Sequence, residues 1–218
     1  DGVSDETAAA IPMQGITAHY LITSTVELRP GDDVLLHAAA GGVGLLATQL
    51  ATLRGARVIG TVGTPVKEEL ARQAGATDVI RYRELDDLTR QLPALVRELT
   101  SGVGVRAAYD SVGKDTFQAS LDSLQPFGLM VSFGNASGPV PPMPLTALKG
   151  SLYITRPVLM SHTANRANLE EMAADLFRMV GSGKVKIEIE RRYRLADAGQ
   201  AHRDLEARAT TGSSVILP

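Results

Sequence analysis

The chain has 218 residues, enough to bury a full hydrophobic core, and 44% of them are apolar. A formal net charge of −2 gives no support to a nucleic-acid partner, and no apolar run approaches the length of a membrane span. The absence of cysteine excludes disulfides, thiolate nucleophiles and cysteine-ligated zinc, and the four histidines lack the paired spacing of a metal site. We therefore expect a soluble, cytoplasmic protein without a metal.

The chain starts at Asp1 rather than at a methionine, and its first recognisable element is a helical segment over residues 7–18. No strand precedes this segment, so we expect a fragment whose upstream part is missing. Residues 1–30 are assigned as a linker helix region.

Residues 34–46 are the most informative stretch. They are typical of a buried strand that turns through small residues directly into an apolar helix. Ala39, Gly41 and Gly44 stand at the three glycine positions of the G-x-G-x-x-G fingerprint. Small residues let a pyrophosphate approach the backbone, and a helix N-terminus offers free N–H groups, so a dinucleotide site is favoured over a turn that needs glycine only for packing. His37, at the end of the strand, is interpreted as a hydrogen-bonded core residue rather than a catalyst.

Strands and helices alternate after this point. Further strands are predicted at residues 57–62, 78–82, 106–110, 128–133 and 151–155. Helices are predicted at residues 65–75, with Thr64 and Pro65 as the cap and first turn, at 86–100, divided at Pro93, and at 115–124. Such alternation predicts an α/β fold: a doubly wound parallel six-stranded Rossmann sheet of order 3-2-1-4-5-6.

The end of the second predicted strand bears on the choice of dinucleotide. NAD enzymes usually carry an acidic residue there to bind the ribose hydroxyls, whereas this chain has Gly63. With Lys67, Arg81 and Tyr82 expected nearby, NADP(H) is favoured. The alternative is that Lys67 is an ordinary solvated lysine on a helix.

Several runs of residues carry a resemblance when they are taken as a set. They are 15–18, 37–44, 60–64, 109–113, 128–135 and 208–212. With them the chain resembles the zinc-free, ζ-crystallin-like NADPH:quinone oxidoreductases of the medium-chain dehydrogenase/reductase superfamily. The resemblance implies hydride transfer from NADPH to a quinone without a metal. It also implies that an N-terminal GroES-like catalytic domain is lacking, that residues 31–184 form the dinucleotide-binding domain, and that residues 185–218 are a C-terminal remnant returning to the catalytic domain.

The resemblance further implies which residues bind the cofactor, while it assigns no catalytic residue. Lys67 and Tyr82 would hold the 2′-phosphate, with Arg208 as a further phosphate contact. A homodimer is expected through the edge strand Leu152–Thr155 and the adjoining Leu159 and Met160. The full set of implied NADPH contacts is Thr17, Gly42, Val43, Gly63, Lys67, Tyr82, Ser111, Phe133, Gly134 and Arg208.

Two other functions remain open. One is an enoyl reductase of the same superfamily that acts on acyl thioesters, and the other is a non-catalytic nucleotide-binding or structural module. A short-chain dehydrogenase is disfavoured, because none of the five tyrosines is followed four residues later by lysine.

Overall fold

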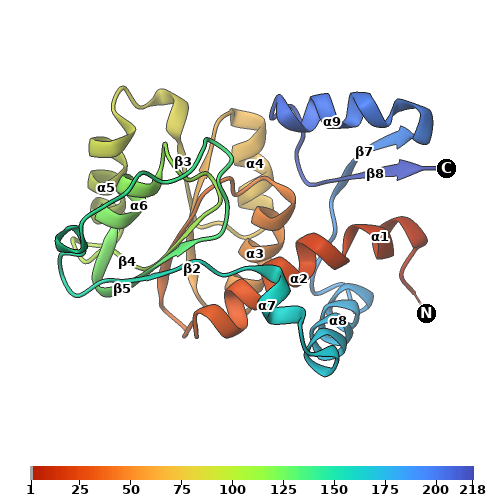
Figure 1. Cartoon of the computed structure of the whole chain (residues 1–218), viewed down its shortest axis with the longest axis horizontal. Coiled ribbons are helices and arrows are strands. Elements are labelled where there is room, and N and C mark those ends of the chain that lie inside the picture. Colours follow the sequence, from red (N-terminus) through yellow and green to blue (C-terminus); the bar gives the residue numbers. More distant parts are fainter. Residues whose placement is uncertain (1) are drawn as a thin grey trace.

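The computed structural model describes residues 2–218 and centres on a six-stranded sheet (Figure 1). Its strand order is β3-β2-β1-β4-β5-β6, and all neighbouring strands are parallel, which confirms the predicted topology. The strands are β1 (Asp33–Leu36), β2 (Arg57–Val62), β3 (Asp78–Arg81), β4 (Val105–Asp110), β5 (Leu124–Ser132) and β6 (Tyr153–Thr155).

Both faces of this sheet are covered, because the central strands are apolar on both sides. In β1, Val34 and Leu36 belong to one hydrophobic cluster and Leu35 to the other. The first cluster includes side chains of α2, α3 and α8, and the second includes side chains of α5 and α6. The helices of the body are α1 (Asp5–Ala10), α2 (Pro12–Tyr20), α3 (Gly42–Leu53), α4 (Pro65–Gln73), α5 (Leu88–Leu99), α6 (Phe117–Asp122), α7 (Leu159–Thr163) and α8 (Arg166–Gly181).

Local sequence explains where two of the helices begin. Thr64 caps α4 by accepting a hydrogen bond from the Lys67 amide at 3.3 Å, and Pro65 is the first helical residue, as predicted. The segment expected as one helix over residues 7–18 is instead two helices, α1 and α2. Ser4 caps the first of them, and Leu21–Thr25 continue the second as a π-helical turn.

The predicted division at Pro93 is wrong, since α5 runs unbroken through this residue. Pro93 is the sixth of the twelve residues of α5, and its missing N–H leaves the carbonyl of the exposed Thr89 without its helical partner, while the Pro93 ring is buried. Asp87 fixes the start of the helix by accepting from the Arg90 amide at 3.1 Å.

Other element boundaries differ from those predicted by one to four residues, among them those of α6, β5 and β6. Helix α6 is shorter than residues 115–124, because Leu124 already pairs with Val105 and starts β5 ahead of a bulge. Strand β5 therefore begins four residues earlier than expected. Strand β6 begins at Tyr153 rather than at residue 151, and Ser151 has a left-handed backbone with φ +58°.

The C-terminal residues form a small unit beside the body, drawn in blue in Figure 1. Strands β7 (Ile189–Arg194) and β8 (Ser213–Leu217) pair in parallel, and α9 (Ala198–Glu206) connects them. A single β-bridge joins Gly212 of this unit to Gly41 of the body. Within residues 2–218, no helix is both long and apolar enough to cross a membrane.

Candidate functional site

The loop between β1 and α3 is shaped by the absence of side chains. Ala38 adopts the left-handed region with φ +53°, and the Gly41 amide donates to the Ala38 carbonyl at 2.9 Å. A β carbon at Gly44 would lie 2.8 Å from the Ala39 carbonyl carbon, closer than real β carbons approach backbone. The turn therefore requires glycine at this position, and it brings the helix directly behind the strand.

The N-terminus of α3 is open to a ligand. Its cap residue is Gly41, which has no side chain to satisfy the first amides of the helix. The amides of Gly42 and Val43 are in that first turn, and the helix dipole adds positive charge there. A β carbon at Gly42 would overlap the carboxamide of Gln14, which closes one side of the loop. This arrangement suits the pyrophosphate of a dinucleotide.

Basic and phenolic groups gather at the end of β2. A β carbon at Gly63 would lie 2.9 Å from the Tyr82 hydroxyl and 3.2 Å from Nε of Arg83, so these two side chains face the glycine. Arg81 has a different role from the one expected, because it pairs with Glu68 at 3.3 Å and with Glu84 at 3.1 Å. Sequence reasoning missed Arg83, whose position depends on the short 3-10 turn Tyr82–Glu84.

The C-terminal loop reaches this same edge of the sheet. Nζ of Lys67 donates to the Arg208 carbonyl at 2.9 Å, and Nη2 of Arg208 donates to the Ala136 carbonyl at 3.1 Å. Arg208 has a left-handed backbone with φ +55°. The structure therefore brings Lys67 next to the backbone of Arg208, 141 residues away in the sequence, while the Arg208 guanidinium contacts the loop after β5.

The loops that follow β4 and β5 are joined through their backbones. The Ala136 amide donates to the Ser111 carbonyl at 3.2 Å, and a β carbon at Gly134 would lie 2.5 Å from the same oxygen. Phe133 and Val43 are partly buried against the first hydrophobic cluster, and Thr17 is half-buried on α2, which packs on α3. The predicted site residues thus lie on loops at the carboxyl ends of the strands or on helices beside them.

A buried polar chain lies beneath these loops. Oδ1 of Asp110 accepts from the amides of Val112 at 2.8 Å and Gly113 at 2.9 Å, and its Oδ2 accepts from Oγ of Ser120 at 2.8 Å. Nε2 of His37 lies 2.8 Å from the same Ser120 oxygen. Burial lowers the pKa of His37, although the Asp110 charge opposes this effect. His37 is therefore a neutral, hydrogen-bonded core residue, as predicted.

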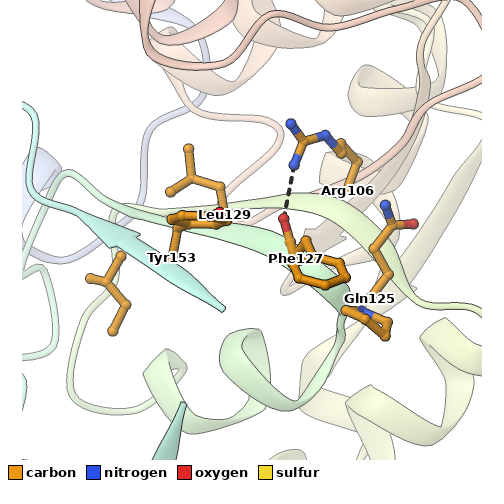
Figure 2. Close-up of a pocket in the computed structure, with 7 residues that line it drawn as sticks. Arg106, Gln125, Phe127, Leu129 and Tyr153 are labelled. Carbon is orange, nitrogen blue, oxygen red and sulfur yellow. Dashed lines mark hydrogen bonds between the residues drawn. The ribbon is translucent and has the colours of Figure 1, made fainter. Parts of the chain in front are cut away.

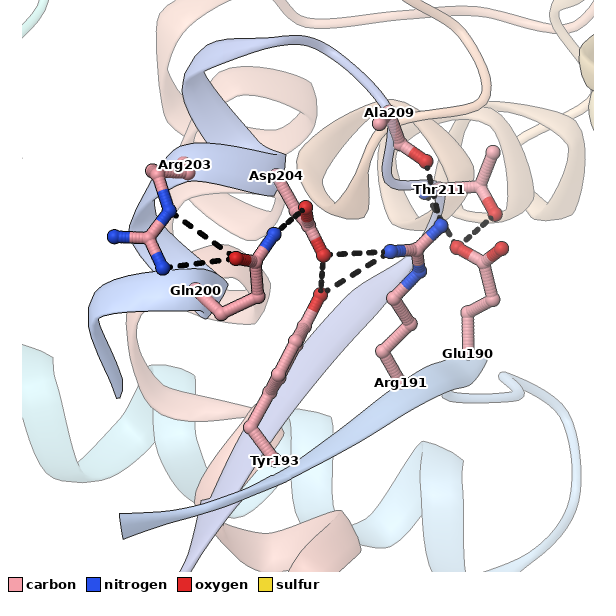
Figure 3. Close-up of polar contacts among 8 residues, drawn as sticks. All are labelled: Glu190, Arg191, Tyr193, Gln200, Arg203, Asp204, Ala209 and Thr211. Atoms are coloured by element: carbon pink, nitrogen blue, oxygen red, sulfur yellow. Dashed lines mark hydrogen bonds and ion pairs between the residues drawn. The ribbon is translucent and has the colours of Figure 1, made fainter. Parts of the chain in front are cut away.

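The C-terminal unit has a polar network of its own, shown in Figure 3. Oδ2 of Asp204 accepts from the Tyr193 hydroxyl at 2.8 Å and from Arg191 at 2.7 Å. The Tyr193 hydrogen bond is the main cause that lowers the pKa of Asp204. A carboxylate oxygen of Glu190 accepts from both the amide and the hydroxyl of Thr211, each at 2.6 Å. These contacts hold the strand pair together and fix the loop that carries Arg208.

Two hollows of the surface lie away from the glycine loop. One is at the edge of the sheet, where Arg106, Phe127, Leu129 and Tyr153 are among the lining residues and Arg106 donates to the Phe127 carbonyl at 3.0 Å (Figure 2). Another lies between α2 and α8 beside the His19–Asp175 contact of 3.0 Å. The glycine loop itself offers backbone amides rather than a deep cavity, and amides are what phosphate recognition needs.

The next feature is the arrangement of the side chains that could bind a metal ion. Among residues 2–218, no group of three or more His, Cys, Asp or Glu side chains is arranged to hold a metal ion. The described residues therefore do not fit a zinc centre.

Comparisons with known proteins agree with this geometry. A model of the zinc-binding dehydrogenase family matches residues 42–178. Quinone oxidoreductase of Pseudomonas aeruginosa is 50% identical over 220 residues, which cover 100% of this chain and 66% of that protein. Quinone oxidoreductase of Escherichia coli, solved in complex with NADPH, superposes with a TM-score of 0.93 at 49% identity, covering 99% of this chain and 66% of that one.

A relative with a different name is also similar. The 2-haloacrylate reductase of a Burkholderia species is 41% identical over 219 residues, covering 99% of this chain and 64% of that protein. The chain thus spans just under two thirds of the length of the curated relatives it matches. By the family match and the identity along its whole length, the chain belongs to the zinc-binding dehydrogenase family, among its quinone oxidoreductase relatives.

Proposed function

We propose that this chain is the NADPH-binding part of an oxidoreductase that transfers hydride from NADPH to a quinone without a metal. The observation that carries the proposal is the glycine loop, which leads into the open N-terminus of α3 while Gly63 faces Tyr82 and Arg83. The family match, and the NADPH bound by the Escherichia coli relative, support this cofactor.

Each part of the site has a role in this proposal. The amides of Gly42 and Val43 bind the pyrophosphate, Lys67 and Tyr82 bind the 2′-phosphate, and Arg208 is a further phosphate contact. The missing acid at Gly63 avoids repulsion of that phosphate. Thr17, Ser111, Phe133 and Gly134 complete the set of expected contacts, and we add Arg83 to the 2′-phosphate group.

Bound NADPH would supply the hydride, and the residues of this chain would bind and orient it. Positioning of donor and acceptor accounts for much of the rate in such reactions. We assign residues 31–184 to the dinucleotide-binding domain and residues 185–218 to a segment that returns to the catalytic domain. We propose likewise that the whole protein reduces a quinone.

The experiment is an isothermal titration calorimetry measurement of the affinity of the chain for NADPH and for NADH. We expect NADPH to bind more tightly than NADH by about tenfold or more, because charge-assisted contacts to the 2′-phosphate have no counterpart in NADH. Equal affinities would contradict the NADP(H) assignment. The lack of binding to either would contradict the nucleotide site itself.

A second candidate is reduction of an activated carbon–carbon double bond, as in the enoyl reductase alternative. The similarity to 2-haloacrylate reductase favours it. Turnover of a quinone and of an unsaturated acyl thioester by the whole protein distinguishes the two reactions, since one acceptor should be reduced far faster.

We also propose a homodimer through the edge strand β6. The side chain of Tyr153 is 59% exposed and that of Ile154 40% exposed, and an unpaired apolar edge is usually covered by another strand. Met160, 77% exposed, would extend the interface. Light scattering should give twice the chain mass at micromolar concentration, whereas a monomer would contradict this assembly.

A further inference from the structure

His37, Ser120 and Asp110 form one continuous hydrogen-bonded chain beneath the glycine loop. All three side chains are at most 2% exposed. Nδ1 of His37 contacts Oγ1 of Thr61 at 2.9 Å, and Nε2 contacts Oγ of Ser120 at 2.8 Å. The site residues proposed above do not include any of these groups.

The protons of this chain can be assigned from its contacts. The Ser120 hydroxyl has one proton and two acceptors within reach, Oδ2 of Asp110 at 2.8 Å and the Thr116 carbonyl at 3.0 Å. The charged carboxylate, which is also the nearer of the two, is assigned as the acceptor. The oxygen of Ser120 is then left to accept a proton from Nε2–H of His37. Nδ1 must consequently accept from the Thr61 hydroxyl, which satisfies every member of the chain with His37 neutral.

This chain connects the ends of three strands to two loops of the nucleotide site. His37 is next to Ala38, whose left-handed backbone opens the glycine loop. Thr61 is in β2, and its carbonyl also accepts from the Ala39 amide at 3.1 Å. At the other end, Asp110 holds the amides of Val112 and Gly113, which fold the loop that carries Ser111.

We propose that the chain from Thr61 through His37 and Ser120 to Asp110 is a positioning device, which fixes the glycine loop and the loop 111–113 relative to one another with His37 held as its Nε2–H tautomer. Its effect on NADPH rests on the proposed function. Its effect on the two loops does not, because that effect is a property of the protein without ligand.

The molecule offers a matched control for Ser120. Ser123 is on the same helical segment and is also fully buried, and its hydroxyl donates to the Ala119 carbonyl four residues back at 2.7 Å. Ser120 makes the same kind of contact to the Thr116 carbonyl at 3.0 Å, but it alone also contacts His37 and Asp110. Ser120→Ala and Ser123→Ala therefore remove the same atom from equally buried positions, and only the first breaks the chain.

The test is amide hydrogen exchange by NMR on the unliganded chain, followed by NADPH titration. We expect Ser120→Ala to speed exchange at Val112, Gly113 and the glycine loop by about tenfold, and to weaken NADPH by a similar factor. Ser123→Ala should leave both quantities near the wild-type values. Equal effects of the two variants, or none from Ser120→Ala, would overturn the proposal.

The tautomer gives a second measurement that needs no variant. The ring ¹⁵N signals of His37 at neutral pH should show one protonated and one unprotonated nitrogen, with Nε2 carrying the proton. A protonated Nδ1 would overturn the assignment. If wild-type chain fails to bind NADPH while Ser120→Ala still loosens both loops, the proposed function fails and the positioning device stands.

Discussion

The body of the molecule and its C-terminal unit are held together in different ways. Strands β1 and β4 are almost entirely buried between two apolar clusters, whereas α9 has no buried residue, and Leu195 and Leu205 on that unit are each more than 60% exposed. The C-terminal unit depends on polar contacts such as Arg191–Asp204 and Glu190–Thr211. Because α9 adds no buried residue, this unit should open well before the body does. Arg208 nevertheless comes from the weaker region.

The largest expected effect tests the body. Asp110→Ala leaves the amides of Val112 and Gly113 without their acceptor, and it removes the charged acceptor of the Thr116 and Ser120 hydroxyls, which keep only backbone carbonyls. Each unsatisfied buried donor costs about 1–3 kcal/mol, so we expect the free energy of unfolding to fall by about 3 kcal/mol or more. Urea unfolding followed by circular dichroism measures this loss. A change below about 1 kcal/mol would mean that water reaches these donors.

The next prediction concerns the contact between the two regions at Lys67. Lys67→Ala should weaken NADPH binding by about tenfold to a hundredfold and leave NADH nearly unchanged, because a charged hydrogen bond is worth about 1.5–3 kcal/mol. Calorimetry with both cofactors measures it, and Lys149→Ala, which removes an exposed lysine, is the control. Equal small changes in the affinities for both cofactors would contradict the role of Lys67 and would leave Tyr82 and Arg83 to bind the 2′-phosphate.

A local loss is expected in the C-terminal unit. Glu190→Ala removes the acceptor of both the Thr211 amide and its hydroxyl. We expect hydrogen exchange in β8 to speed by about tenfold, with the global unfolding free energy unchanged. Mass spectrometry of the exchanged peptides measures both regions in one experiment. If exchange sped up equally in β1 and β4, the two regions would form one cooperative unit.

The smallest effect is a pH dependence of the body. Burial lowers the pKa of His37 in the folded chain, while in the unfolded chain the residue takes up a proton as the pH falls below about 6.5. Below that pH the unfolded state binds more protons than the folded state does. The free energy of unfolding therefore falls on acidification, by at most about 1.4 kcal/mol per pH unit, and this loss is absent above about pH 6.5. His37→Gln should flatten this slope between pH 6.5 and 5, and exposed His202→Gln is the control. An unchanged slope in His37→Gln would show that other groups cause it.

The sequence predicted the sheet order and the glycine loop because both follow from local patterns. Apolar runs such as 57–62 match β2 residue for residue, and small residues at 38–44 require a tight turn. The helix was wrongly predicted to divide at Pro93. The carbonyl that loses its partner there is that of the exposed Thr89, which can bind water instead, and the sequence alone does not show this exposure. Arg83 was missed because no motif marks it. It lies two residues past the end of β3, in a 3-10 turn that directs its side chain to Gly63. The chain through His37 and Asp110 could not be seen, since it joins residues that only the folded sheet brings together.

The bridge between Gly41 and Gly212 has a consequence for the order in which the molecule assembles. Its partners are 171 positions apart, and closing so long a loop costs entropy that only contacts with a folded body can offset, so we expect the bridge to form after the body has folded. A nucleotide bound at the glycine loop and touching Arg208 would then contact both parts of the molecule. It would stabilise the docked position of the C-terminal unit, which docks last. Ligand concentration, by mass action, would set how much of the population has its C-terminal unit docked.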